Sequence, residues 1–325
     1  MALINDTATL KTHITIGELS NLAPILPYVI EAELKFIKPI LGDSLYTSLK
    51  AEVESASVAG VNIPLLPYVQ KPLANLSYYT YLPVSAVNLS GGGVRTDREN
   101  AAFKWQQDKV EETFLSIGNR AIDELLKYLE TNSTDFPTWK SSTAYTLYAS
   151  QFIKDASTYN SFVFINESRR TFLRLANTIK EVELFTIRPI LTEPLYTLVK
   201  ADLTASTPNA DYQALIPYIQ PIIAHLAIAR AIEFMHLIIT EDGAIEFKTK
   251  AQDRGNKEAA NAALAQVIRF KTKSEHTAAA YILELVNFLN LNTTIYPQFI
   301  NSSSYIDPTK DEVLIRDKSA VYNLL

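Results

Sequence analysis

The sequence predicts a mainly α protein made of two tandem, structurally similar helical-bundle domains, each with a short β-hairpin arm. The first observation is an internal repeat: residues 33–52, ELKFIKPILGDSLYTSLKAE, match residues 183–202, ELFTIRPILTEPLYTLVKAD, at an offset of 150 positions. The second is a set of long segments in which apolar residues recur at helical spacing. The third is composition, because 47% hydrophobic and 20% charged residues are enough for two packed cores.

The repeat continues beyond this first window. LLPYVQ at 65–70 matches LIPYIQ at 215–220 at the same offset, and residues 125–145 match residues 285–305 at an offset of 160. A period this long indicates a domain duplication rather than a solenoid of short repeats. A duplicated module also favours a building block over an enzyme, since an enzyme needs only one site.

The ends of the two halves resemble each other as well. The segment that begins FIKD at residue 152 is similar to the segment that begins LIRD at residue 314, and each continues with a serine, a tyrosine and an asparagine. We interpret both segments as domain ends. This predicts a first domain at residues 1–162 and a second domain, with an extended hairpin arm, at residues 163–325; both have an ordinary domain size.

The first helix expected in each half is interrupted by proline. Apolar residues at helical spacing predict a helix from Leu22 to Leu41, with Pro39 deep inside it and Pro189 at the matching position. An internal proline bends or ends a helix, so a kink is predicted in both halves. A second, short helix is expected at 45–53, after the turn signal Gly-Asp-Ser.

The third helix is expected to be central. It should run from Pro67 to about Tyr81, and from Pro217 to about Ile239 in the second half. The second-half segment is apolar on nearly every face, which is typical of a helix buried on all sides.

Two hairpin arms and two long helices follow. Short β-prone runs that flank glycine at 87–95 and 238–247 predict the hairpins. Long apolar stripes predict helices at 97–129 and 257–289. Because the repeat offset rises from 150 to 160, about six added residues are placed in the second arm and four in the second long helix. After each long helix, Phe136 to Trp139 and Tyr296 to Phe299 mark a break with aromatic anchors, followed by a polar loop.

Composition excludes several classes of protein. The chain has no cysteine, so no disulfide, thiolate metal site or cysteine nucleophile is available. The amino-terminal residues do not show the pattern of a signal peptide, and no uninterrupted apolar run is long enough to span a membrane. The formal net charge of −5 argues against broad coating of DNA.

No catalytic, cofactor-binding or metal-binding residues are predicted. His225 and His236 lie three helical turns apart and cannot share a metal ion, and His13 and His276 are isolated in the sequence. The run SGGGVRT at 90–96 lacks the Gly-Lys-Ser/Thr ending of a phosphate loop and is interpreted as a turn. The carboxylates Glu111, Glu112, Glu31 and Glu33 are interpreted as a solvated face.

Seven residues are candidates for interfaces. By contrast, Tyr46 and Tyr196 are not among them, because they recur in register and are expected to pack in the core.

A tyrosine cluster is present only in the first half. The hairpin arms and the basic stretch 248–273 carry charges that could meet DNA phosphate or an acidic partner. The candidates are Tyr78, Tyr79, Tyr81, Arg95, Lys248, Lys250 and Arg254.

Three segments carry a family resemblance. They are GVRTDREN with AFKWQ at 93–106, FPTW at 136–139, and ESRRTFLRL with IRPIL at 167–191. Together they resemble a structural-protein family of phages and prophages from the Bacteroidetes. The segment IKPILGDSLY at 37–46 also resembles the first helices of head–tail connector (adaptor) proteins of tailed phages.

The resemblance implies a structural virion protein with no catalytic residues. Such adaptors form a ring below the portal, through which DNA passes, so the expected partners are copies of this chain, portal and tail or neck proteins, and non-specifically the passing DNA, but no membrane. The expected location is the virion, assembled in the cytoplasm of the host bacterium. Ordinary adaptors are single modules in twelve-fold rings, so a fused pair leaves six and twelve copies open. The alternatives are another tail-completion or neck-ring protein and, from a different class, an enzyme with a site between the halves.

Overall fold

The computed structural model describes residues 2–16, 21–85, 88–90, 93–95, 104–234, 237–239, 245–247 and 257–307. Contacts divide the chain into two compact units, Met1–Thr146 and Leu147–Leu325. Both units are mainly helical, so the predicted fold class of two similar helical domains is confirmed. Each unit is described below by itself.

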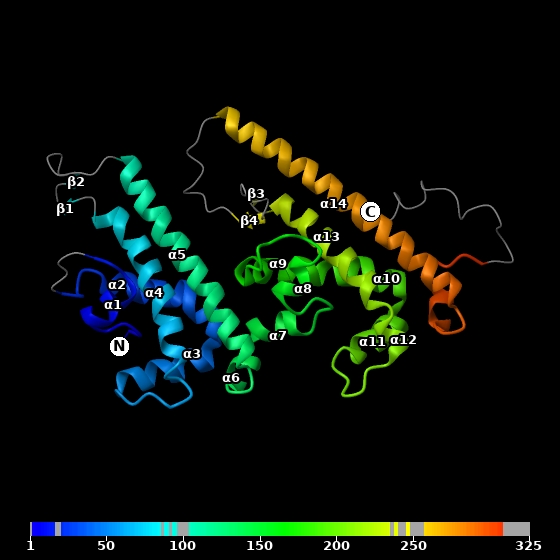
Figure 1. Cartoon of the computed structure of the whole chain (residues 1–325), viewed down its shortest axis with the longest axis horizontal. Helices are drawn as coiled ribbons and strands as arrows, with labels where there is room; N and C mark the ends of the chain where they lie inside the picture. The colour runs from blue at the N-terminus through cyan, green and yellow to red at the C-terminus, as the bar shows by residue number, and fades with distance from the viewer. Residues whose placement is uncertain are drawn as a thin grey trace. The chain divides into compact units, whose positions relative to one another are not determined.

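The first unit is built around a pair of long helices. The helix α4 (Leu65–Ser85) packs along α5 (Lys104–Thr131), as Figure 1 shows. The shorter elements α1, α2 and η1 pack on α4, and α3 packs on η1 and α6. The element α6 and part of α7 follow α5. The bounds of these shorter elements are α1 Thr7–His13, α2 Leu26–Ala32, η1 Glu33–Ile37, α3 Lys38–Glu54, α6 Pro137–Lys140 and α7 Thr143–Ala149.

The second unit repeats this plan. Its central helix α13 (Ile216–Phe234) packs on α14 (Lys257–Leu291) and on α9 (Arg169–Val182). The remaining elements are α8 Ala156–Asn160, η2 Glu183–Ile187, α10 Arg188–Leu191, α11 Glu193–Asp202, α12 Ala210–Gln213 and the 3-10 helix η4 Pro297–Asn301. Ile219, Ile222 and Ile223 of α13 are fully buried, as the all-round apolar sequence predicts.

The predicted proline kink is a π-helical turn in both units. The N–H of Lys38 donates to the carbonyl of Glu33, and the N–H of Arg188 donates to the carbonyl of Glu183, which are bonds five residues apart. The proline follows at once, as the second residue of α3 or α10. Since proline has no N–H to continue the α-helical pattern, the wider turn lies where that pattern is interrupted.

A sharp backbone break follows the proline at the same repeat position. Gly42 has φ 77° inside α3, and Thr192 has φ 70° between α10 and α11. Glycine adopts this conformation without steric penalty, whereas threonine is strained there. The second unit therefore keeps the conformation of the first without its glycine.

The close approach of α4 and α5 depends on a small residue. A Cβ atom added to Gly118 of α5 would lie 2.7 Å from Leu76 of α4. Leu73, Leu76 and Leu125 are fully buried at this helix pair. Glycine here lets the two apolar faces interdigitate, which offsets its poor helix propensity.

Each unit also has one short antiparallel strand pair. β1 (Asn88–Ser90) pairs with β2 (Gly93–Arg95), and β3 (Leu237–Ile239) pairs with β4 (Ile245–Phe247). Two residues separate the paired strands in the first unit and five in the second. The second arm is therefore longer, in the predicted direction. The full placement of the six added residues involves positions outside the described residues.

The described contacts move the domain boundary. We predicted it at residue 162, with residues 152–160 as the end of the first domain, but the division lies between Thr146 and Leu147. Phe152 and Tyr159 are buried in the second unit, where the Tyr159 hydroxyl donates to the carbonyl of Ala224 at 2.8 Å. The segment therefore begins the second unit instead of ending the first.

The polar loop predicted after the first long helix is wrong. The segment instead forms α6, α7 and α8, and buries large side chains such as Trp139 and Tyr148. The indole N–H of Trp139 donates to the carbonyl of Ile40 at 3.1 Å, which holds this segment against α3. These turns are too short for a periodic pattern, so aromatic content was the better signal.

One segment is long and apolar enough to cross a membrane. Among the described helices, only Ala210–Glu233 meets this criterion, which tolerates a few charged residues and so differs from a search for uninterrupted apolar runs. Within the second unit, 61% of its most apolar window is buried against other elements. Such burial is typical of a central core helix.

The break at Gly42 yields a stability prediction. A Cβ at Gly42 would lie 2.6 Å from Cβ of Ser142 in a backbone region unfavourable for other residues. We expect Gly42→Ala to lower the free energy of unfolding by about 1–3 kcal/mol, measured by urea denaturation followed by circular dichroism. Gly60→Ala is the matched control because nothing lies within 4 Å of its Cβ position. Equal effects of the two substitutions would contradict the strain argument.

Candidate functional site: two buried carboxylate networks

The first unit contains a fully buried carboxylate. Glu33, the first residue of η1, is 0% exposed. Its carboxylate accepts hydrogen bonds from the backbone N–H of Leu3 and from the hydroxyl of Tyr46 at 2.9 Å, and Lys50 lies 3.4 Å away. A carboxylate in an apolar interior is strongly unfavourable unless it is paired and hydrogen-bonded. Here its partners come from the amino-terminal segment and from α3.

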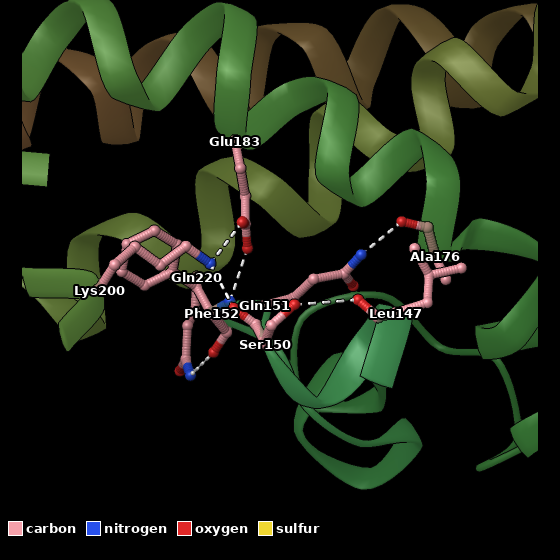
Figure 2. A network of polar contacts seen from close by, with 8 residues as sticks. All are labelled: Leu147, Ser150, Gln151, Phe152, Ala176, Glu183, Lys200 and Gln220. Atoms are coloured by element: carbon pink, nitrogen blue, oxygen red, sulfur yellow. Dashed lines mark hydrogen bonds and ion pairs between the residues drawn. The ribbon is translucent and has the colours of Figure 1, made fainter. Parts of the chain in front are cut away.

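The second unit contains the same network at an offset of 150 residues. Figure 2 shows Glu183 accepting from the backbone N–H of Phe152 at 2.6 Å and forming an ion pair with Lys200 at 2.5 Å. Lys200 also donates to the carbonyl of Ser150 at 2.7 Å. Both charged groups therefore hold the backbone of the same short segment.

A glutamine completes each network. The amide of Gln70 donates to the carbonyl of Leu3, and that of Gln220 donates to the carbonyl of Phe152, both at 2.9 Å. The single residue Leu3, or Phe152, thus has its N–H bound by a glutamate and its C=O bound by a glutamine. Two side chains fixed on helices hold one residue of an extended segment, as a neighbouring β-strand would.

The held segments share a helix cap. Asp6 accepts from the N–H and the hydroxyl of Thr9, both at 2.7 Å, and caps α1. Asp155 caps α8 in the same way through Thr158, at 2.7 and 2.9 Å. An aspartate cap stabilises the start of a helix by about 1 kcal/mol. Each segment therefore has an extended part and a capped helical turn.

Apolar anchors fix both segments. Leu3, Ile4 and Leu10 are at most 1% exposed, and Phe152, Ile153 and Tyr159 are at most 2% exposed. These residues occupy matching positions: in each segment, two of them precede the capping aspartate and the third lies in the helix that follows it. We call the network of glutamate, lysine and glutamine the acceptor and call residues 3–10 and 152–159 the docking segments.

Burial shapes the electrostatics of the second acceptor. Desolvation raises the pKa of Glu183 even though the charge of Lys200 opposes that change. Desolvation also lowers the pKa of Lys200, against the charge of Glu183. Burial and the charge of Glu183 raise the pKa of Tyr196 to about 12.

The chemistry of this arrangement is binding. In both acceptors the carboxylate is occupied by a backbone N–H and a cation, and it faces the chain's own segment. Among the described residues, no group of three or more histidine, aspartate or glutamate side chains is placed to hold a metal ion. The acceptors are therefore docking sites for an extended segment that continues into a capped helix.

Sequence reasoning interpreted Glu33 as part of a solvated face, and this is wrong. Glu31 and Glu112 are exposed, but Glu33 lies in the core. The missed signal was the repeat itself. Glu33, Lys50 and Gln70 recur at 150 residues as Glu183, Lys200 and Gln220 within otherwise apolar helices. A polar residue retained at the same core position in both copies indicates a buried network.

The predicted packing role of the repeated tyrosines is confirmed for Tyr46. It is 5% exposed, and its hydroxyl binds Glu33. Tyr196 is half-buried, and its ring meets Phe152 edge-on with centroids 5.9 Å apart. The predicted tyrosine cluster contacts its own unit: Tyr78 packs on Phe114 at 5.2 Å. The other ring contacts there are Tyr78 with Tyr81 at 5.7 Å and Tyr81 with Tyr28 at 5.3 Å.

The other interface candidates have less structural definition. Tyr79 is half-buried on α4, and the backbone of Arg95 pairs with Asn88 in the first hairpin. Lys248, Lys250 and Arg254 lie outside the described residues. The interface roles of these residues and of Tyr78 and Tyr81 stay predictions.

The described part of the basic stretch includes a lysine whose positive charge is paired with carboxylates. Lys271 pairs with Glu233 at 2.5 Å and with Glu275 at 3.7 Å. The hydrogen bond with Glu233 raises the pKa of Lys271. This lysine is engaged within its own unit, whereas Arg269 and Lys273 are exposed on α14.

The described histidines occupy separate environments. His225 is half-buried and stacks on Tyr281 with centroids 6.5 Å apart, and burial lowers its pKa. Burial also lowers the pKa of half-buried His13, and His276 is exposed. His236 lies outside the described residues.

Comparison with protein families matches both repeats to one family. Residues 37–148 and 187–309 each match the family of unknown function DUF6712. The two matches together cover more than half of the chain, so the chain belongs to this family. They begin 150 residues apart, in agreement with the internal repeat. No curated protein and no solved structure matches the chain.

The buried carboxylate should be important for stability. Glu183→Ala leaves the Phe152 N–H and Lys200 without their buried partner, so we expect a loss of about 3–5 kcal/mol in the free energy of unfolding. The matched control is Glu181→Ala near the end of α9, two residues before Glu183, whose ion pair with Arg230 at 3.2 Å is partly exposed. Exposed pairs contribute about 0.2–1 kcal/mol. Urea denaturation of both variants tests this, and similar losses would contradict the role of burial.

The same carboxylate should affect pH dependence. Because the pKa of Glu183 is raised in the folded chain, its contribution to stability is largest below its ordinary pKa of 4.5 and falls as pH rises through the folded value. We expect wild type to gain stability relative to Glu183→Gln as pH is lowered from 7 to 5. Paired urea denaturation curves at the two pH values measure this. If the difference in the free energy of unfolding between wild type and Glu183→Gln stays constant or shrinks on acidification, desolvation is not the dominant influence on the pKa of Glu183.

Proposed function

We propose that this chain is a structural virion protein that assembles with copies of itself into a ring, as a head–tail connector below the portal of a tailed phage. The observation that carries the proposal is the duplication of a complete structural unit, with its acceptor and docking segment, on a framework whose two copies differ at the surface. Ring assembly uses a head-to-tail contact that is repeated around an axis until it closes.

The two units differ at exposed positions beside the acceptors. Phe185 of η2 is 72% exposed, whereas the matching residue of η1 is the exposed Lys35. Leu34 of η1 is also 53% exposed. Large exposed apolar side chains are typical of sites that contact another protein when they gather on one surface. An apolar residue in one unit and a charged one in the other favour two different neighbours.

The helical building plan supports the same role. Each unit presents a long helix paired with a central helix, and a two-stranded arm connects the two. Trp105, near the start of α5, is 67% exposed, and Ile268 on α14 is 54% exposed. In the proposed ring these faces meet neighbouring copies or portal and neck proteins, and DNA passes through the centre without sequence-specific contacts.

Two other functions are weaker explanations of these features. Another ring of the neck or a tail-completion protein would use the same duplication and surfaces, and differs only in its position in the particle. An enzyme requires a group free to react, whereas the buried carboxylates of the two acceptors are bound to backbone N–H groups and lysines. We therefore propose a structural protein rather than an enzyme.

Purification of the full chain followed by mass photometry and negative-stain imaging tests the proposal. We expect closed rings of six or twelve copies. A chain that stays monomeric at every concentration would contradict ring formation.

A surface substitution tests which unit faces its neighbour through apolar contact. Phe185→Ser should reduce the fraction of ring several-fold without changing the circular dichroism spectrum, because it removes exposed apolar area and no core contact. Lys35→Ser, at the matching position of the first unit, is the control and should leave most of the ring intact. Equal ring fractions for both variants would contradict a contact at Phe185.

A further inference from the structure

The sequence pattern of the docking segments occurs a third time in the chain. The docking segments share one pattern: an apolar residue, isoleucine, any residue, aspartate, three further residues and another apolar residue. Residues 3–10 read LINDTATL, residues 152–159 read FIKDASTY, and residues 314–321 read LIRDKSAV. The positions that define the pattern are those that the structure buries or uses as the helix cap in both docked copies.

The structure changes the interpretation of residues 314–321 as a domain end. Similar segments at 152 and 314 could both be domain ends, but the segment at 152 begins the second unit and is held by its acceptor. Residues 314–321 come after Asp307, the last described residue of the second unit, whose acceptor already holds residues 152–159. The third segment therefore needs an acceptor other than that one.

We propose that residues 314–321 of one copy dock onto the acceptor of the first unit of a second copy, formed by Glu33, Lys50 and Gln70, in place of its own residues 3–10. This inference rests on the proposed self-assembly and names the contact that links the copies. Exchange of equivalent segments between copies requires no new type of contact.

The sizes of the anchors select the first unit. Its acceptor holds the aliphatic residues Leu3, Ile4 and Leu10, and the third segment offers Leu314, Ile315 and Val321. The second acceptor holds phenylalanine and tyrosine, and the tyrosine hydroxyl is bound to Ala224. An aliphatic segment there would leave cavities in the core, which are destabilising.

Charge complementarity also favours docking. In the second unit, Lys154 of the docking segment donates to the carbonyl of Leu203 at the end of α11, at 2.7 Å. The corresponding residue of the third segment is Arg316, and the corresponding carbonyl of the first unit is that of Val53 near the end of α3. A basic side chain is favourable beside the carboxyl-terminal end of a helix.

The contact would be directional. It joins the end of one copy to the start of the next, and a heterologous contact of this kind closes into a ring when its rotation permits. Six residues separate Asp307, the last described residue, from Leu314. These residues span at most about 20–25 Å, so the docking unit must lie close to the second unit of the donor.

Cross-linking of mixed isotopes tests the inference in the full chain. Equal amounts of unlabelled and nitrogen-15-labelled chain are mixed, allowed to exchange, treated with an amine-reactive cross-linker and analysed by mass spectrometry. We expect Lys318 of one isotope to link to Lys50 of the other. A link from Lys318 to Lys200, beside the second acceptor, should be several-fold rarer. Links within one isotope only, or a preference for Lys200, would overturn the proposal.

Two substitutions sharpen the test. Ile315→Asp places a charge at a position fully buried in both docked copies and should abolish the Lys318–Lys50 link between copies. Ser319→Asp, at the position of Ala8 and Ser157, which are exposed, should retain it. Both residues lie outside the described residues. A circular dichroism spectrum equal to that of wild type is required of both variants as the control for folding. An Ile315→Asp chain that keeps the link would overturn the inference.

Imaging the same samples separates this inference from the proposed ring. Rings that persist in the Ile315→Asp variant would overturn the docking contact and leave the ring proposal standing. Links between copies in open chains without rings would support the docking contact and contradict the ring. Closed rings that are lost only in the Ile315→Asp variant would support both.

Discussion

The structure of each unit depends on satisfying one buried carboxylate. Glu33 and Glu183 lie in apolar surroundings, where an unpaired charge would be strongly unfavourable. The required partners come from separate parts of the sequence: a backbone N–H of the docking segment and a lysine of α3 or α11. A glutamine of α4 or α13 binds the carbonyl of the same segment residue. One electrostatic requirement thereby fixes the positions of three elements that apolar packing alone would leave free to slide.

The two copies satisfy this requirement in different ways. In the first unit the hydroxyl of Tyr46 binds the carboxylate closely and Lys50 lies farther away, whereas in the second unit Lys200 approaches closely. The backbone break beside the network is made with Gly42 in one copy and with a strained Thr192 in the other. The two copies thus hold the carboxylate and the backbone break in the same places with different residues. Exposed residues nearby differ in polarity, because Lys35 of the first unit corresponds to Phe185 of the second. A shared framework with different surfaces suits a component that has different neighbours.

Much of the architecture could be predicted because it depends on local periodicity. The central helices, the two long helices and the interruption at Pro39 and Pro189 all leave patterns within one segment of the chain. The acceptors could not be predicted in this way, because their partners are brought together from positions as far apart as Leu3 and Gln70. The domain boundary predicted at residue 162 was wrong for the same reason. The first docking segment, LINDTATL, has too little similarity to FIKDASTY to be recognised before both were seen bound in the same way.

The sequence by itself determined the helical class, the duplication and the absence of cysteine chemistry, since these follow from composition, period and repeated residues. Only the tertiary structure decided that Glu33 is buried, that residues 152–159 open the second unit, and that a short apolar pattern acts as a docking segment. The physical reason is that burial and pairing belong to contacts between distant segments. A glutamate on a helix has the same sequence signature whether its side chain faces water or a backbone N–H in the core.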